Sequence, residues 1–332
     1  MRRHSNRENR TTRSGRRPFA LGLALLLLLA VTLAAQVRPK KADAETLVVD
    51  VDLVVLHTTV VDEKGHLVTD LPAGNFRVYE DNVEQKLSVF RNEDVPVTAG
   101  LVLDNSASMR PNRHQMMAGA LRFIETSNAM DEVFVVNFND DYYLDLRDKD
   151  FSNDVKELKE ALEKTNTRGS TAFYDALRAS LQHLKRGTRQ KKVLLVITDG
   201  VDNASVSRFD AVLREAQQSE AGIYLVALPC EGNDKRDCRR AKREMRKLAD
   251  LSGGLATFPT SIEQVDALCR QIAHDIRNQY VIGYYPSNKA RDGSFRNVRV
   301  DIINAPKGTG KLTPRHRMGY YAGPSPAGAG SQ

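Results

Sequence analysis

One carboxylate and two hydroxyls follow an apolar segment of the chain at alternate positions. Residues 97–103 form an apolar run that predicts a buried parallel strand, and Asp104, Ser106 and Ser108 come directly after it. Oxygen side chains of this kind suit a hard cation such as Mg²⁺. The carboxyl end of a strand is also where open α/β sheets bind ligands. The stretch therefore predicts one half of a cation site.

The other half of such a site must come from distant residues, because one carboxylate alone would hold a cation weakly. Thr171 stands in a Gly-Ser-Thr turn before a predicted helix. Asp199 follows a second apolar strand, residues 193–197, in a Thr-Asp-Gly sequence. The alternative is that Asp104 and Ser106 only cap the helix that follows them.

The order of these three motifs resembles the von Willebrand factor A domain, over residues 96–278. The resemblance implies a metal-ion-dependent adhesion site that binds Mg²⁺ or Mn²⁺, some ligands directly and some through water. By that resemblance the metal ligands are Asp104, Ser106, Ser108, Thr171 and Asp199. All five positions match the family's pattern. The resemblance also implies that the cation bridges to an Asp or Glu carboxylate of a partner protein.

Strands and helices alternate between residues 96 and 278. Further apolar runs at residues 133–136 and 223–228 predict strands, and residues 142–146 predict a short edge strand. Apolar residues at helical spacing separate them, as in the stripe of Phe173, Leu177, Leu181 and Leu184. Such alternation predicts an α/β fold: a doubly wound, mostly parallel sheet with helices on both faces.

Strand patterns without a helical period flank this segment, at residues 44–95 and 279–322. Each flank has too few strands to bury a core alone. We therefore predict that they pair into one immunoglobulin-like β-sandwich into which the α/β domain is inserted. The whole chain resembles a bacterial group of exported proteins related to the A domain.

The amino terminus looks like a targeting segment. Residues 1–17 carry seven Arg against one Glu, which gives +6 of the chain's net +7. The basic balance is thus a targeting feature and gives no reason to expect nucleic acid binding. We predict a signal peptide over residues 1–35, or an uncleaved anchor in the membrane through residues 19–33. Either one places the rest of the chain outside the cytoplasm: periplasmic, on the cell surface or secreted.

Polar or small-residue segments complete the domain scheme. Residues 36–43 are predicted to be a linker, and the Gly-, Pro-, Ala- and Ser-rich residues 323–332 a disordered tail. Cys230 and Cys238 flank a seven-residue polar loop, and in an exported protein we expect them to pair. Helix 235–247 is strongly basic on its outer face. That face either meets an anionic partner or is only solvated.

The site chemistry favours a protein-binding module of cell adhesion type over an enzyme. An aspartyl phosphatase would carry a second acid where Ser106 stands, and no general base accompanies the motif. A metal-dependent hydrolase is therefore the least favoured hypothesis. A structural or envelope-assembly role, in which the metal only stabilises the fold, is the second alternative.

Overall fold

The computed structural model describes residues 53–230, 234–306 and 308–323. The predicted signal or anchor, the linker and nearly all of the predicted tail lie outside these residues. Within the described part, no helix is both long enough and apolar enough to cross a bilayer.

A six-stranded sheet forms the centre of the α/β domain, in the order β10-β9-β8-β5-β6-β7. All neighbouring strands are parallel except β7, which pairs antiparallel with β6 at the edge. The strands are β5 (Val97–Asp104), β6 (Glu132–Phe138), β7 (Tyr142–Leu144), β8 (Lys191–Thr198), β9 (Gly222–Ala227) and β10 (Leu255–Thr257). Every residue of β5 is buried, because both faces of the sheet are covered.

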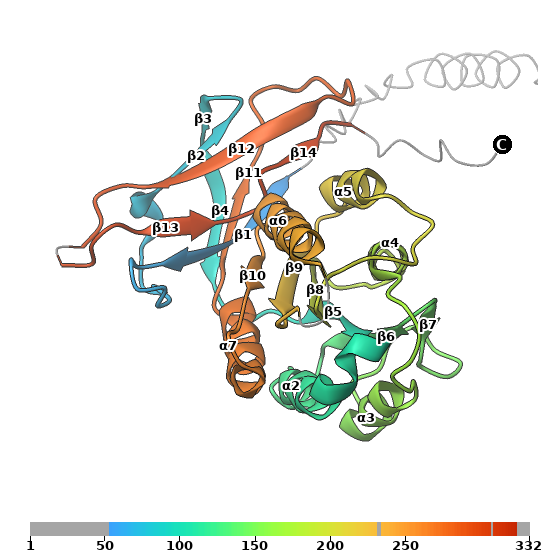
Figure 1. Cartoon of the computed structure of the whole chain (residues 1–332). Helices are drawn as coiled ribbons and strands as arrows, with labels where there is room; N and C mark the ends of the chain where they lie inside the picture. Colours follow the sequence, from blue (N-terminus) through green and yellow to red (C-terminus); the bar gives the residue numbers. More distant parts are fainter. Residues whose placement is uncertain (1–52, 231–233, 307, 324–332) are drawn as a thin grey trace, which may run out of the picture. The chain divides into compact units, whose positions relative to one another are not determined.

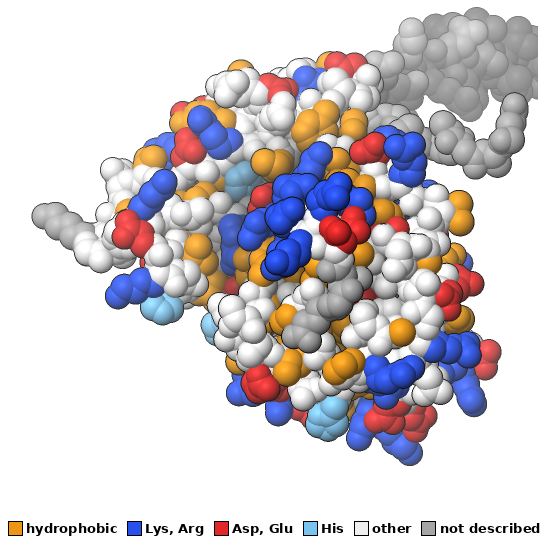
Figure 2. Space-filling view, viewed as in Figure 1, with side chains coloured by type: hydrophobic (Ala, Val, Ile, Leu, Met, Phe, Trp, Pro, Cys, Tyr) orange, Lys and Arg blue, Asp and Glu red, His pale blue; other side chains and the backbone are white. Residues whose placement is uncertain are grey.

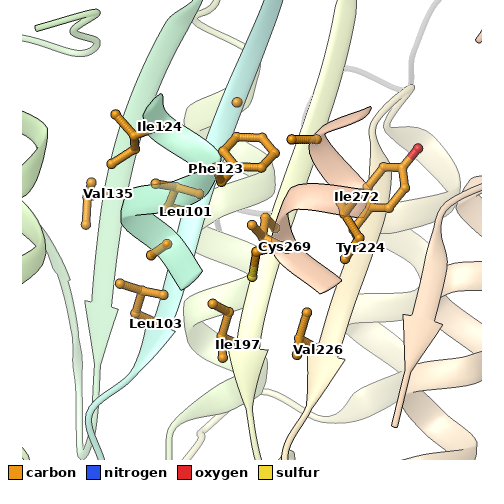
Figure 3. Packing of buried hydrophobic residues seen from close by; sticks show 14 of the residues in the cluster. Leu101, Leu103, Phe123, Ile124, Val135, Ile197, Tyr224, Val226, Cys269 and Ile272 are labelled. Atoms are coloured by element: carbon orange, nitrogen blue, oxygen red, sulfur yellow. The ribbon is translucent and has the colours of Figure 1, made fainter. Parts of the chain in front are cut away.

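Helices cover the two faces in two sets of three (Figure 1). Helices α2 (Arg113–Glu125), α3 (Val155–Glu163) and α7 (Val265–Arg277) cover one face, and α4 (Phe173–Leu184), α5 (Phe209–Gln218) and α6 (Lys235–Ser252) cover the other. In Figure 3, Phe123 of α2 and Ile272 of α7 pack over the sheet residues Leu101 and Ile197. The doubly wound α/β prediction is thereby confirmed.

Two four-stranded sheets lie outside this domain, in the orders β13-β1-β11-β4 and β14-β12-β2-β3. Their strands are β1 (Val54–Val61), β2 (Phe76–Glu80), β3 (Val83–Gln85), β4 (Leu87–Asn92), β11 (Tyr280–Tyr284), β12 (Phe295–Ile302), β13 (Thr313–Arg315) and β14 (Gly319–Tyr321). Each sheet combines strands that precede the α/β domain with strands that follow it. Residues of both sheets, such as Leu56 and Val300, share one hydrophobic core. The immunoglobulin-like classification stays a prediction.

Candidate metal centre

Asp104 lies at the carboxyl end of β5 and is fully buried. The turn after it folds back, so that the Ser106 backbone N–H donates to Asp104 Oδ1 at 2.9 Å. A short 3-10 helix, Ala107–Asn112, begins at once and brings the hydroxyls of Ser106 and Ser108 to 3.1 Å from each other. Ser108 is exposed while Asp104 and Ser106 are buried, so this group of oxygens opens to solvent on the Ser108 side.

Asp199 lies at the same edge of the sheet as Asp104, because β8 is the parallel neighbour of β5 and the carboxyl ends of both strands meet there. Thr198, the last residue of β8, donates its hydroxyl to Asp104 Oδ2 at 2.6 Å. The same hydroxyl accepts the Gly200 backbone N–H at 2.8 Å, which fixes the turn around Asp199. Gly200 has a φ of +79°, and a Cβ there would lie 2.4 Å from Met245 Cε of α6. The turn therefore packs closely against α6.

Thr171 reaches the site on a loop that is tied to both turns. The backbone N–H of Arg168 donates to the Asn105 carbonyl at 2.9 Å, and that of Ala107 donates to the Gly169 carbonyl at 3.1 Å. Beyond Asp199, the Asn203 side chain accepts the Thr171 backbone N–H at 2.8 Å. Thr171 is buried, and its hydroxyl has no hydrogen-bond partner among the residues that the structure describes. The three motifs thus converge on one edge of the sheet.

Two side chains that the sequence analysis did not single out help to shape this site. Thr198 bonds Asp104 directly, and Asp140, which comes shortly after β6, accepts the Ser170 backbone N–H at 2.7 Å. A Cβ on Gly169, whose φ is +71°, would lie 1.9 Å from Asp140 Oδ2. Position at or just after the end of a strand was the available signal, because parallel strands end at the same edge of the sheet.

A buried polar chain holds the Asp104–Ser106 turn from behind. Asn105 donates from Nδ2 to Asn137 Oδ1 at 2.8 Å, and Asn137 donates in turn to Asp145 Oδ2 at 2.6 Å. Lys164 pairs with Asp145 at 3.1 Å. These hydrogen bonds hold the turn in place, although the buried Asn105 Oδ1 has no hydrogen-bond partner among the described residues.

The two carboxyl groups of the site are in electrostatic conflict. Burial raises the pKa of Asp104 to about 7, and the neighbouring Asp199 acts in the same direction. Hydrogen bonds from Ser106 and Thr198 favour the charged form but do not restore an ordinary pKa. Neither carboxylate forms an ion pair with a cationic side chain of the described part. The donor set therefore fits a hard cation, which would supply the missing positive charge.

Hydroxyls are needed to complete such a site. Among the residues that the structure describes, no group of three or more His, Cys, Asp or Glu could hold a metal. With two carboxylates only, a cation here would also draw on Ser106, Ser108 and Thr171. This is the donor set that the sequence motifs predicted, and metal binding itself stays a prediction.

The amino end of α6 lies at the same edge of the sheet as the candidate metal site. Strand β9 runs parallel to β8 and leads to Cys230, which forms a disulfide with Cys238 on α6, their Cα atoms 6.0 Å apart. Figure 2 shows Lys and Arg side chains gathered over this helix. Its exposed basic residues are Lys235, Arg236, Arg239, Arg240, Arg243, Arg246 and Lys247.

Comparison with known protein families gives one match. Residues 100–201 match the von Willebrand factor type A domain, a range that includes all five predicted ligands. No curated protein matches the chain.

Three solved structures show the extent of the structural likeness. The pilus adhesin SpaC from Lactobacillus rhamnosus GG is 13% identical, with 73% of this chain and 47% of that one covered and a TM-score of 0.47. A von Willebrand factor type A protein from Catenulispora acidiphila is 14% identical (82% and 64% covered, TM-score 0.48). The vWF domain of the pilus tip protein Mfa5 from Porphyromonas gingivalis is 13% identical (55% and 95% covered, TM-score 0.45). The chain spans about half of the SpaC structure. Residues 100–201 of this chain therefore match the von Willebrand factor type A domain, and the match covers the central part of the α/β domain.

Proposed function

We propose that this protein is an exported binding module in which a divalent cation bridges to a carboxylate of a partner protein. The cation would be Mg²⁺ or Mn²⁺, held by Asp104, Ser106, Ser108, Thr171 and Asp199. The observation that carries the proposal is the buried pair Asp104 and Asp199, which has no cationic side chain of the described residues to balance it. When bound, the cation supplies an electrophilic position that accepts an Asp or Glu oxygen from outside.

The burial of the site residues limits the direction from which a partner can approach the cation. Asp104 is buried and held by the Ser106 N–H and the Thr198 hydroxyl, so it cannot reach outward. Ser108 is exposed and marks the open side. A partner carboxylate would therefore enter over Ser108 and the Gly169–Thr171 loop.

The basic outer face of α6, residues 235–247, would form a second part of the surface that contacts the partner protein. Gly200 packs on Met245 of α6, so the helix adjoins the Asp199 turn. Lys and Arg dominate the exposed side of this helix (Figure 2). An acidic partner would be steered toward the metal by this face, because a patch of one charge sign raises association rates.

Two observations support a location outside the cytoplasm. Residues 1–35 read as a signal or anchor, and the structure holds the Cys230–Cys238 disulfide. Disulfides persist in the oxidising environment outside the cytoplasm. The same proposal includes the two alternatives for this segment: a signal peptide that is removed, or an anchor that stays in the membrane through residues 19–33.

Calorimetric titration of Mg²⁺ and Mn²⁺ into the full chain tests the metal site. The wild type is compared with Asp199→Asn and Thr171→Val, and with Asp210→Asn as a control that removes an exposed carboxylate on α5. We expect binding in the wild type and the control, and at least a ten-fold loss in the two site variants. Equal affinity in Asp199→Asn and wild type would refute the ligand assignment.

Partner capture with the immobilised chain then separates adhesion from a structural role. Capture of envelope proteins in Mg²⁺ that is lost in EDTA, and lost in Asp199→Asn, supports the bridging role. Capture that is the same in Mg²⁺ and in EDTA would instead favour a structural or assembly protein.

A further inference from the structure

A polar cavity lies at the opposite end of β8 from the candidate metal site. Its volume is about 360 Å³, and it opens where the amino ends of β8 and β9 meet β1. A second cavity of about 290 Å³ adjoins it, since both are lined by His57 and by residues 188–191. Because β8 has eight residues, roughly 25 Å separate this region from Asp199.

Cationic side chains dominate the walls of the two cavities. The basic lining residues are Arg91, Arg189, Lys191, Lys192 and Arg317, together with His57. Only two acids line them, Glu93 and Glu220. Glu220 is exposed and pairs with Arg317 at 3.0 Å. Arg91 pairs with Glu93 at 3.4 Å and Arg189 pairs with Glu132 at 3.8 Å. The positive charge that no acidic side chain of the described residues pairs is therefore that of Lys191 and Lys192.

Two buried nitrogen atoms of these walls have no hydrogen-bond partner among the described residues. They are Arg317 Nε and His57 Nδ1. The guanidinium of Arg317 is permanently charged and only 12% of its side chain is exposed, so an unpaired N–H there is costly. Lys192, half-buried beside them, forms no hydrogen bond or ion pair with any residue in the described part. Arg317 Nε and Lys192 therefore lack an acceptor, and the neutral His57 ring lacks a partner at Nδ1.

Burial, with a smaller contribution from neighbouring cations, shifts the pKa values of two groups in the cavity walls. Burial lowers the pKa of His57 to about 3, and the charges of Lys191 and Arg317 act in the same direction. Burial likewise lowers the pKa of Lys191 to about 7, with Arg277 adding to the effect and with Asp94 and Asp131 acting against it. An anion in the cavity would relieve both groups.

We propose that this cavity binds a small phosphate-bearing anion. The cations come from several separate elements, namely β4, the loop before β8, β8 itself and the segment before β14, and they surround the space from different sides. An anion with several oxygens, such as phosphate, can accept from Lys192 and from Arg317 Nε, which have no acceptor among the described residues, while the paired cations add to the positive field. The volume equals that of about twelve water molecules, so an organic group attached to the phosphate also has room. Thr188 and Gln190 offer it polar contacts.

Pyrophosphate is the probe for this site, and citrate is the carboxylate of comparable charge. Each is titrated by calorimetry into the full chain in EDTA, which removes any cation that could bind phosphate at the metal site. The variants are Arg317→Gln, which retains a polar side chain without the charge, and Lys192→Gln. Arg299→Gln is the matched control, because Arg299 is an exposed cation that stacks on Tyr79 outside both cavities.

The expected result is saturable pyrophosphate binding that exceeds citrate binding. Loss of one charge-assisted hydrogen bond should weaken it roughly ten-fold or more in each cavity variant, with no change in Arg299→Gln. Lys192→Gln keeps the test decisive if Arg317→Gln unfolds, since Lys192 has no partner to lose in the described part of the chain. The proposal is overturned if pyrophosphate does not bind, if only citrate binds, or if Lys192→Gln binds as the wild type does.

Discussion

Replacing Asp104 with asparagine should stabilise the metal-free protein while it destroys the metal site. The side chains have the same shape, but the amide carries no charge. The amide oxygen in Asp104→Asn would keep an acceptor for the Ser106 N–H, which donates to Asp104 Oδ1 at 2.9 Å. The variant would lose the acceptor for the Thr198 hydroxyl, now 2.6 Å from Asp104 Oδ2. The stability of the variant therefore depends on whether removing the buried charge outweighs losing the hydrogen bond from Thr198.

The pKa of Asp104 determines how much the free energy of unfolding should rise in Asp104→Asn. It is raised from 3.8 to about 7, first by burial and then by Asp199. At about 1.4 kcal/mol per pKa unit, ionisation above pH 7 costs the folded state about 4 kcal/mol. The mismatched hydrogen bond to Thr198 costs about 1–2 kcal/mol. We therefore expect Asp104→Asn to raise the free energy of unfolding by about 2–3 kcal/mol at pH 8 without metal.

The direction of the pH dependence follows from the raised pKa. A carboxyl whose pKa is higher in the folded state favours folding at pH values below 3.8, and this contribution is lost as the pH rises toward 7. The advantage of Asp104→Asn should thus shrink as the pH falls toward 4. Urea unfolding in EDTA, followed by circular dichroism, measures the difference in the free energy of unfolding between Asp104→Asn and the wild type at pH 4.5 and at pH 8.

Added Mg²⁺ should reverse the order of the two proteins. A ligand present at about 1,000 times its Kd stabilises the folded state by about 4.1 kcal/mol. Only the wild type gains this, and it exceeds the advantage of about 2–3 kcal/mol that Asp104→Asn has without metal. Asp175→Asn is the control. Although burial acts against it, the pKa of Asp175 is lowered by hydrogen bonds from Ser207 and Val206, so this variant should lose stability at pH 8. An Asp104→Asn protein less stable than wild type in EDTA at pH 8 would refute the electrostatic reasoning.

Three further substitutions test the contacts around the site. Thr198→Val leaves a buried oxygen of Asp104 and a backbone N–H unpaired, so urea unfolding should show a loss of about 2–4 kcal/mol that Thr198→Ser largely avoids. Gly169→Ala places a Cβ 1.9 Å from Asp140 at a φ of +71°, which should displace the loop and weaken Mg²⁺ binding roughly ten-fold in calorimetry. Cys230→Ser opens a short covalent loop and should cost about 2–3 kcal/mol in thermal or urea unfolding, whereas wild type treated with reductant should match it.

Local patterns in the sequence were sufficient for the α/β domain. The apolar runs at residues 97–103 and 193–197 lie within β5 and β8, and the helical stripe from Phe173 to Leu184 is buried on α4. The pairing of early with late strands followed from a simple physical limit, since neither flank had enough strands for a core. The three-residue strands β10 and β13 were not predicted, because so few residues carry no readable alternation.

Contacts between distant residues explain what the sequence could not predict. Thr198 bonds Asp104 across 94 positions of the chain, and only the register of β5 with β8 brings them together. Glu80 accepts hydrogen bonds from the hydroxyls of Tyr284 and Tyr320, which lie 204 and 240 positions away. The basic cavity collects residues from several elements in the same way. Each of these residues, read alone, looks like an ordinary polar residue of a strand or a loop.

Strand β8 connects the two candidate sites and also keeps them separate. It has hydrogen-bonded neighbours on both sides, β5 and β9, and seven of its eight residues are buried. A one-residue shift would turn each of its side chains to the opposite face of the sheet, so the strand cannot slide to transmit a signal. Lys191 at its amino end and Asp199 just beyond its carboxyl end are therefore held at a fixed separation. We therefore expect an anion bound in this cavity to stabilise the junction with the flanking strands without altering the metal ligands.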